Sequence, residues 1–154
     1  MKATDLRIGN WVLIPTSMDG IIIPSFPKKV KGIGIFGGID FTEPEYPENH
    51  IVPAVHCAGI PLTEEWLLKF GFNERETLGT KYYSLGMEAD YGAEIIAYKK
   101  EYLMLREIHF DWRIYLTDCD GGKIGSDKEY IHQLQNLYFA LNNKELKIKD
   151  NEKV

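Results

Sequence analysis

The chain has 154 residues, of which 44% are hydrophobic and 27% charged, and 18 basic against 23 acidic side chains give a net charge of −5. This composition is that of an ordinary globular protein, and a chain of this length can bury one good core without metal or disulfide staples. It excludes collagen-like, disulfide-rich and largely disordered proteins. It also argues against nucleic acid as a partner of the whole chain, because neutralising phosphates requires an excess of lysine and arginine.

The sequence gives no sign of export or of membrane insertion. Met1–Arg7 carries charges where a signal peptide needs an apolar stretch. The longest apolar runs, such as Ile21–Ile23, are far shorter than the ~20 residues that cross a bilayer. Cys57 and Cys119 stand far apart, and two reduced thiols are the simplest interpretation. We therefore expect a cytoplasmic protein with no membrane partner.

Residues 1–60 are predicted to form a β-rich lobe. A glycine turn precedes the apolar stretch Trp11–Ile14, a turn at Met18–Gly20 precedes Ile21–Ile23, and Lys29–Ile35 is a third candidate strand with two glycines. A glycine turn that leads into short strands is similar to the entry of SH3-like barrels. Prolines and glutamates in residues 42–61 indicate an extended connector, which is the best candidate boundary between two lobes.

A short helix is predicted directly after this connector. Thr63 is a good N-cap, and Glu64 and Glu65 place negative charge in the first turn, where the helix dipole favours it. Gly71 can adopt the left-handed conformation that ends a helix, with Phe72 folding back on Leu67.

Alternating patterns predict an antiparallel sheet after this helix. The candidate strands are Lys81–Leu85, Ala93–Lys99, Tyr102–Arg106 and Glu107–Thr117, and the last two could instead form one bent strand. A second helix is expected after the capping box Ser126–Glu129, with Asn143 as its left-handed terminator. The predicted fold is therefore α+β, with a possible SH3-like lobe over 1–60, a helix–antiparallel sheet–helix lobe over 61–143 and a charged, frayed tail over 144–154.

Three stretches of the chain look familiar together: Met1–Val12, Ile60–Phe72 and Tyr130–Leu141. They resemble a family of small proteins from Bacteroidetes genomes, their prophages and mobile elements, a family with no established activity. The matching stretches anchor the start, the middle and the end of the chain. The resemblance implies a genomic setting and no mechanism.

The second predicted helix carries the main candidate binding surface. On a helical wheel, His132, Gln135, Asn136 and Phe139 lie away from the apolar stripe. An aromatic residue among amides is typical of an interface anchor, which favours contact with an unknown protein partner. The alternative is that this face packs on the β-rich lobe of the same chain.

Two further sites support alternative functions. Lys28, Lys29 and Lys31 form a basic cluster near aromatic residues, which could bind nucleic acid or could simply protect a solvated strand edge.

The second alternative is a small enzyme. His109, Asp111 and Arg113 share one face of a predicted strand, where a histidine beside a carboxylate could transfer protons and an arginine could hold an anion. A solvated sheet face needs such residues as well.

No catalytic, cofactor or metal motif is present in the sequence. The interpretation that we favour is a non-catalytic protein-binding or accessory protein of phage or mobile-element biology, and the oligomeric state is left open.

Overall fold

The computed structural model describes residues 1–18, 21–41, 51–86, 94–104, 107–117, 123–127 and 129–149. Within these ranges the side chains of 15–18, 21–26, 100–104, 107–111, 113, 115–117 and 123–127 are not described. The chain divides into two compact units: unit 1 joins Met1–Pro61 to Tyr130–Leu137, and unit 2 joins Leu62–Glu129 to Tyr138–Val154.

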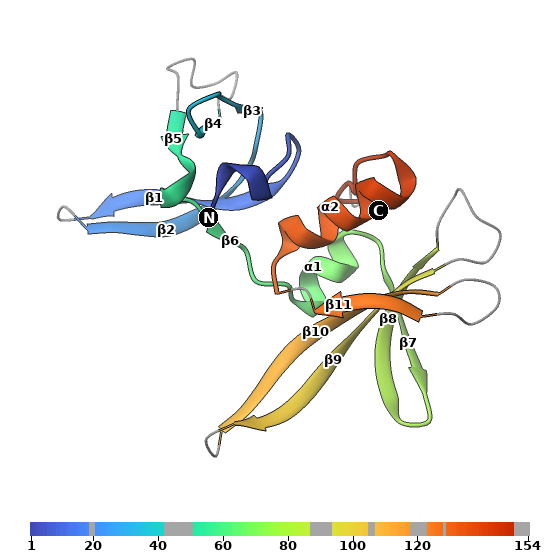
Figure 1. Cartoon of the computed structure of the whole chain (residues 1–154). Coiled ribbons are helices and arrows are strands. Elements are labelled where there is room, and N and C mark those ends of the chain that lie inside the picture. The colour runs from blue at the N-terminus through green and yellow to red at the C-terminus, as the bar shows by residue number, and fades with distance from the viewer. Residues whose placement is uncertain are drawn as a thin grey trace, which may run out of the picture. The chain divides into compact units, whose positions relative to one another are not determined.

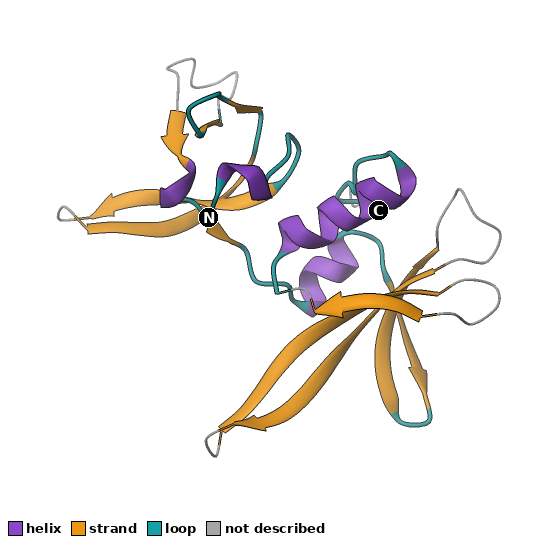
Figure 2. Cartoon of the chain, viewed as in Figure 1, coloured by secondary structure: helices purple, strands orange, loops and turns teal. Residues whose placement is uncertain are grey.

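Unit 1 contains two small antiparallel sheets (Figures 1 and 2). The first has the strand order β2-β1-β6 and the second the order β3-β4-β5. Two 3₁₀ turns, η1 and η2, accompany them. The bounds are β1 (Trp11–Met18), β2 (Ile21–Lys29), β3 (Gly32–Ile33), β4 (Gly38–Asp40), β5 (Ile51–Pro53), β6 (Ala58–Gly59), η1 (Ala3–Asp5) and η2 (Ala54–His56).

The core of unit 1 brings both sheets and both 3₁₀ turns together. Gly9 has a φ of 96°, which permits the tight turn before β1, and its amide donates to the Val30 carbonyl at 2.8 Å. The predicted glycine turn is therefore confirmed. The buried apolar residues of this core are Leu6, Val12, Val30, Ile39, Phe41, Ala54 and Cys57.

The first half of the second helix, α2 (Ile131–Asn142), completes unit 1. The Ile131 amide donates to the Ile60 carbonyl at 2.9 Å. The Gln135 side chain accepts a hydrogen bond from the Trp11 amide at 2.9 Å and donates to the Gly9 carbonyl at 3.2 Å. The buried amide of Gln135 thereby bonds to two backbone groups at the start of β1.

Unit 2 is built on a five-stranded antiparallel sheet with the order β11-β10-β9-β8-β7 (Figure 1). The bounds are β7 (Asn73–Thr77), β8 (Thr80–Gly86), β9 (Glu94–Met104), β10 (Glu107–Thr117) and β11 (Lys123–Asp127). With the helices, these antiparallel sheets confirm the mixed α+β class that the sequence predicts.

Helix α1 (Glu64–Lys69) forms for the local reasons that the sequence indicates. The Thr63 hydroxyl accepts a hydrogen bond from the Trp66 amide at 3.3 Å. At the other end Gly71 has a φ of 86°, and the Phe72 amide donates to the Leu67 carbonyl at 3.0 Å. Both the N-cap and the left-handed stop are confirmed.

The structure corrects two of the predictions for unit 2, one about a strand and one about the start of the second helix. Residues 94–104 form the single strand β9, where we expected two strands with a break near Lys100. The polar residues at the expected break continue the ladder, with Lys100 paired to Asp111. The capping box is also wrong, because Ser126 and Asp127 lie in β11, paired with Ile114 and Arg113.

The segment after α2 is ordered by packing within unit 2. Asn143 ends the helix with a φ of 52°, as predicted, and its amide donates to the Phe139 carbonyl at 2.7 Å. Leu146 is buried, and the Lys149 amide donates to the Lys69 carbonyl at 2.8 Å. The expected frayed tail is thus corrected for 144–149, and residues 150–154 lie outside the described part.

The stop of α1 generates a stability prediction for Gly71→Ala. Alanine strains a positive φ, and its Cβ would press on the Lys149 side chain, so we expect the free energy of unfolding to fall by about 1–2 kcal/mol. Urea denaturation measures this change. The control Gly86→Ala meets no atom within 4 Å and should change stability by less than about 0.5 kcal/mol. An equal loss in both variants would contradict this role of Gly71.

Candidate functional site

The structure buries most of the binding face proposed for α2. His132 is 5% exposed and Gln135 is 1% exposed, and both pack within unit 1. Asn136 is half-buried, and its amide donates to the Asp5 carbonyl at 2.9 Å. For these residues the binding hypothesis is corrected, and the alternative of packing on the β-rich lobe holds. The physical reason is that the side-chain amides of Gln135 and Asn136 bond to backbone groups of unit 1, namely the Trp11 amide and the carbonyls of Gly9 and Asp5.

Phe139 lies in the part of α2 that belongs to unit 2. Its side chain is half-buried, which is neither the full exposure expected of an interface anchor nor complete burial. Phe139 therefore gives little support to a docking surface on this helix.

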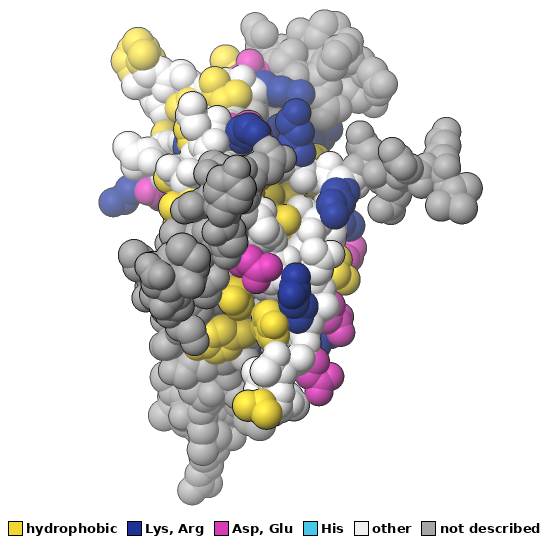
Figure 3. Space-filling view, turned by 90° about the vertical axis from the view of Figure 1, so that its right-hand side faces the viewer, with side chains coloured by type: hydrophobic (Ala, Val, Ile, Leu, Met, Phe, Trp, Pro, Cys, Tyr) yellow, Lys and Arg dark blue, Asp and Glu magenta, His cyan; other side chains and the backbone are white. Residues whose placement is uncertain are grey.

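The basic cluster is less accessible than the sequence suggests. Lys28 and Lys29 end β2 and are half-buried, whereas Lys31 is exposed. On the face shown in Figure 3, described lysine and arginine side chains are interspersed with acidic ones.

The enzyme alternative rests on side chains that lie outside the described part of the chain. The backbone places His109, Asp111 and Arg113 on β10, opposite Tyr102, Lys100 and Tyr98 of β9. The side chains of these three residues are not described, so the enzyme alternative stays a prediction.

An exposed apolar turn joins β3 to β4 in unit 1. The Gly34 amide donates to the Gly38 carbonyl at 2.8 Å, and the Gly37 amide donates to the Gly34 carbonyl at 2.9 Å. Gly37 has a φ of 77°, which allows the chain to reverse in so few residues. The turn presents Ile35 and Phe36 at its tip, 94% and 97% exposed.

A shallow apolar recess of about 420 Å³ lies against this turn. A Cβ at Gly38 would come within 2.7 Å of Ile51, so glycine is what lets the Ile51 side chain lie close to β4. The recess is lined by Gly32, Ile33, Gly34, Ile35, Phe36, Gly38, Asp40 and Ile51. We call the turn and its recess the apolar turn surface.

A second cavity of about 540 Å³ lies within unit 1, at the start of α2. Tyr130 and His132 stack with their ring centroids 5.8 Å apart and an angle of 17° between their planes. A Cβ at Gly59 would come within 2.5 Å of the Tyr130 ring, so only glycine admits the ring there. The lining residues are Met1, Asp5, Cys57, Ala58, Gly59, Tyr130, His132 and Gln133. We call this space the α2 cavity.

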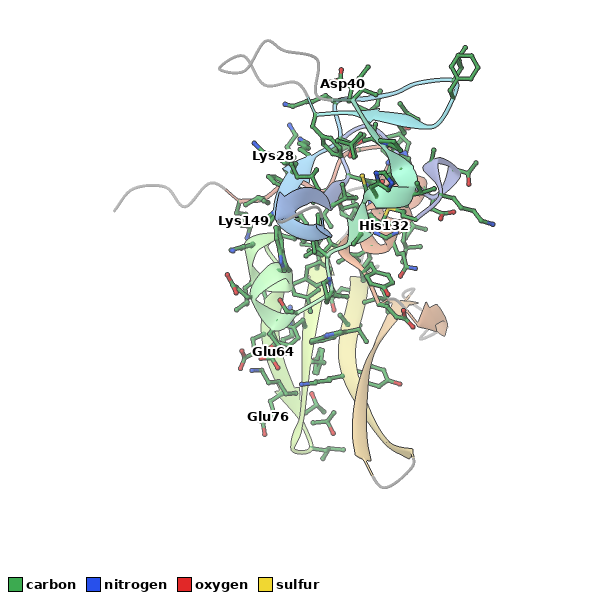
Figure 4. All side chains as sticks on the ribbon, turned by 90° about the vertical axis from the view of Figure 1, so that its left-hand side faces the viewer. Lys28, Asp40, Glu64, Glu76, His132 and Lys149 are labelled. Carbon is green, nitrogen blue, oxygen red and sulfur yellow. The ribbon has the colours of Figure 1, made fainter. Side chains whose placement is uncertain are left out.

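His132 (labelled in Figure 4) is one of two buried titratable groups among the described residues that line the α2 cavity. Burial lowers its pKa, the Asp5 carboxylate opposes that shift, and the chain's α-amino group adds to it. Its Nδ1 atom is buried without a hydrogen-bond partner among the described residues. The imidazole is therefore neutral at pH 7.

Cys57 also lines the α2 cavity, but its environment does not activate it. Burial raises the pKa of the thiol, so it is protonated at neutral pH and is a weak nucleophile. Among the described residues, no group of three or more His, Cys, Asp or Glu side chains could hold a metal ion.

Unit 2 contains a hydrogen-bonded group around Glu64, the first residue of α1. The Tyr83 hydroxyl donates to the Glu64 carboxylate at 2.8 Å, and the Lys81 ammonium donates to it at 3.2 Å. The Tyr83 bond and then the Lys81 bond lower the pKa of Glu64, while burial raises the pKa of Tyr83. With these partners the Glu64 carboxylate stays ionised and the Tyr83 hydroxyl stays protonated at neutral pH. The group therefore has a structural role, which is to tie α1 to β8, and does not act as a proton donor or base.

Comparisons with protein-family models, with curated proteins and with solved structures find no match for this chain. In the part of the chain that the structure describes, no helix is both long enough and apolar enough to span a membrane.

Sequence reasoning missed both the apolar turn surface and the α2 cavity. Ile35 belonged to a predicted strand, although the flanking glycines Gly34 and Gly37 could have indicated a turn. The α2 cavity joins three segments that are far apart in the chain, such as Asp5, Gly59 and Tyr130. No local pattern marks such a site.

Burial of His132 predicts a specific loss of stability in acid. Its pKa is lower in the folded chain than in the unfolded one, so the unfolded state binds the proton first. The free energy of unfolding should therefore decrease as the pH falls from about 6.5 toward the pKa of His132 in the folded chain, by at most about 1.4 kcal/mol per pH unit.

Urea denaturation between pH 8 and pH 5 tests this prediction on the wild type and on His132→Gln. The variant should have the weaker pH dependence. The matched control His56→Gln changes an exposed histidine of η2 and should keep the wild-type dependence. If His132→Gln also keeps it, His132 is not the group responsible.

Proposed function

We propose that this chain is a non-catalytic binding protein and that it docks on a partner protein through the apolar turn surface. The observation that carries the proposal is the nearly complete exposure of two adjacent large apolar side chains, Ile35 and Phe36. A tight, hydrogen-bonded turn holds them at its tip, so little conformational entropy is lost when a partner covers them.

The apolar turn surface has the composition of an interface centre. Contiguous exposed apolar patches with a polar rim are typical of protein-binding sites, and buried aromatic anchors contribute most of the affinity. Phe36 is the anchor in this account, and the recess beside it accepts an apolar side chain from the partner. Ile51, 62% exposed, extends the apolar area along β5.

The charges next to the turn define the partner further. Lys31 is exposed and directly precedes β3, and Asp40 of β4 lines the recess itself. We infer a partner with an apolar pocket for Phe36 and acidic side chains at the edge of that pocket. Electrostatic complementarity of this kind speeds association and fixes orientation.

The broader setting is part of the same proposal. The resemblance to proteins of Bacteroidetes prophages and mobile elements supports an accessory role in that biology, and the buried free thiol of Cys57 supports a cytoplasmic location. Short antiparallel strands after a glycine turn support an SH3-like arrangement of unit 1. Nucleic-acid binding is a less favoured alternative, since the described side chains of Lys28 and Lys29 are half-buried.

Site-specific photo-crosslinking in the native host tests the proposal. Phe36 is replaced by p-benzoylphenylalanine, and a protein partner should be crosslinked at this position. A matched control places the same residue at Leu78, which is 99% exposed at the turn between β7 and β8.

The partner is then purified and its affinity is measured with Ile35→Ser and Lys31→Glu variants. We expect at least about tenfold weaker binding for Ile35→Ser, because an apolar contact at the interface centre is lost. Lys31→Glu should weaken binding as well. Equal crosslinking at both positions, crosslinking to a second copy of the chain, or no effect of Ile35→Ser would contradict the proposal.

A further inference from the structure

The α2 cavity is separate from the apolar turn surface and has the size of a small-molecule site. Pockets that bind small ligands commonly measure about 300–1,000 Å³, and this one measures about 540 Å³. Its walls come from η1, β6 and the first turn of α2, all within unit 1. The site is thus built on ordered elements that the core of unit 1 supports.

The charge in the α2 cavity favours one class of ligand. Among the described residues that line it, two carry a charged group, namely Asp5 with its carboxylate and Met1 with its α-amino group, and no lysine or arginine is among them. Burial lowers the pKa of His132, and of the two charged groups that act on this ring, the Asp5 carboxylate has a larger effect than the α-amino group. The Asp5 carboxylate therefore gives the cavity a counter-ion for a cationic ligand.

The polar groups of the cavity can receive hydrogen-bond donors. One carboxylate oxygen of Asp5 accepts a hydrogen bond from the Lys2 backbone amide at 3.1 Å, and this bond holds the carboxylate in place at the end of η1. His132 is 95% buried, is neutral at pH 7 and has no hydrogen-bond partner among the described residues for its buried Nδ1. A buried polar group of this kind is costly unless a ligand or water completes its environment.

The aromatic wall adds a preference for a flat, positively charged group. The Tyr130 ring is half-buried and fixed between Gly59 and His132. An aromatic face attracts a cation placed within about 6 Å of its centre.

We propose that the α2 cavity binds a small organic cation with a planar N–H-bearing head, such as an amidinium or guanidinium group, with Asp5 as its counter-ion and Tyr130 and His132 as its aromatic wall. This inference does not depend on the partner protein proposed above.

A set of three ligands with one ring and different charges tests the proposal on the full chain at pH 7. Benzamidine is cationic, benzamide neutral and benzoate anionic. Dissociation constants come from amide chemical shifts of the ¹⁵N-labelled protein. We expect shifts at Cys57–Gly59 and Tyr130–Gln133, and binding of benzamidine at least about tenfold tighter than that of benzoate.

The variant Asp5→Asn isolates the counter-ion. The asparagine keeps an oxygen that can accept the hydrogen bond from the Lys2 amide, but it removes the negative charge. The affinity of this variant for benzamidine should therefore drop to its affinity for the neutral benzamide. The control Glu76→Gln makes the same change of charge on β7, at an exposed residue in unit 2 (Figure 4), and should preserve the preference.

Four results would overturn the proposal. These are no binding of any of the three ligands, benzoate binding as tightly as benzamidine, shifts confined to residues outside the α2 cavity, and an unchanged charge preference in Asp5→Asn.

Discussion

The side-chain amide of Gln135 is the interaction on which unit 1 depends. It accepts a hydrogen bond from the Trp11 amide and donates one to the Gly9 carbonyl, and so holds α2 at the start of β1. The two partners are 124 and 126 positions away in the chain. A typical hydrogen bond adds only about 0.5–1.5 kcal/mol, but a buried group left unpaired costs about 1–3 kcal/mol. The bonds of Gln135 thus join α2 to the start of β1, together with the bond from the Ile131 amide to the Ile60 carbonyl and the bond from the Asn136 side chain to the Asp5 carbonyl.

The local elements were predictable because their causes are local. Thr63, Gly71 and Asn143 act through bonds to residues a few positions away, and the structure confirms each of them. Strand β9 was divided wrongly because its polar middle resembles a loop, whereas the pairing of Lys100 with Asp111 continues the ladder. The capping box failed for a related reason: pairing with β10 draws Ser126 and Asp127 into β11 before α2 begins.

The candidate sites were harder to predict because they depend on the tertiary arrangement. A helical wheel identifies the polar face of α2 but not what covers it, and Gln135 is a buried structural residue rather than a contact for a partner. The exposure of Phe36 follows from a turn that limits β3 to two residues. Asp5 and His132 belong to one site only after the two ends of unit 1 are joined.

Hydrogen exchange of the Trp11 amide, measured in the wild type and in Gln135→Leu, tests the central claim most directly. Leucine fills a similar volume but cannot accept the bond, so the Trp11 amide should exchange at least about tenfold faster and the free energy of unfolding should fall by about 1–3 kcal/mol. In the control Asn136→Ala, which removes only a bond to the Asp5 carbonyl, protection at Trp11 should persist. Unchanged protection of Trp11 in Gln135→Leu would contradict the account.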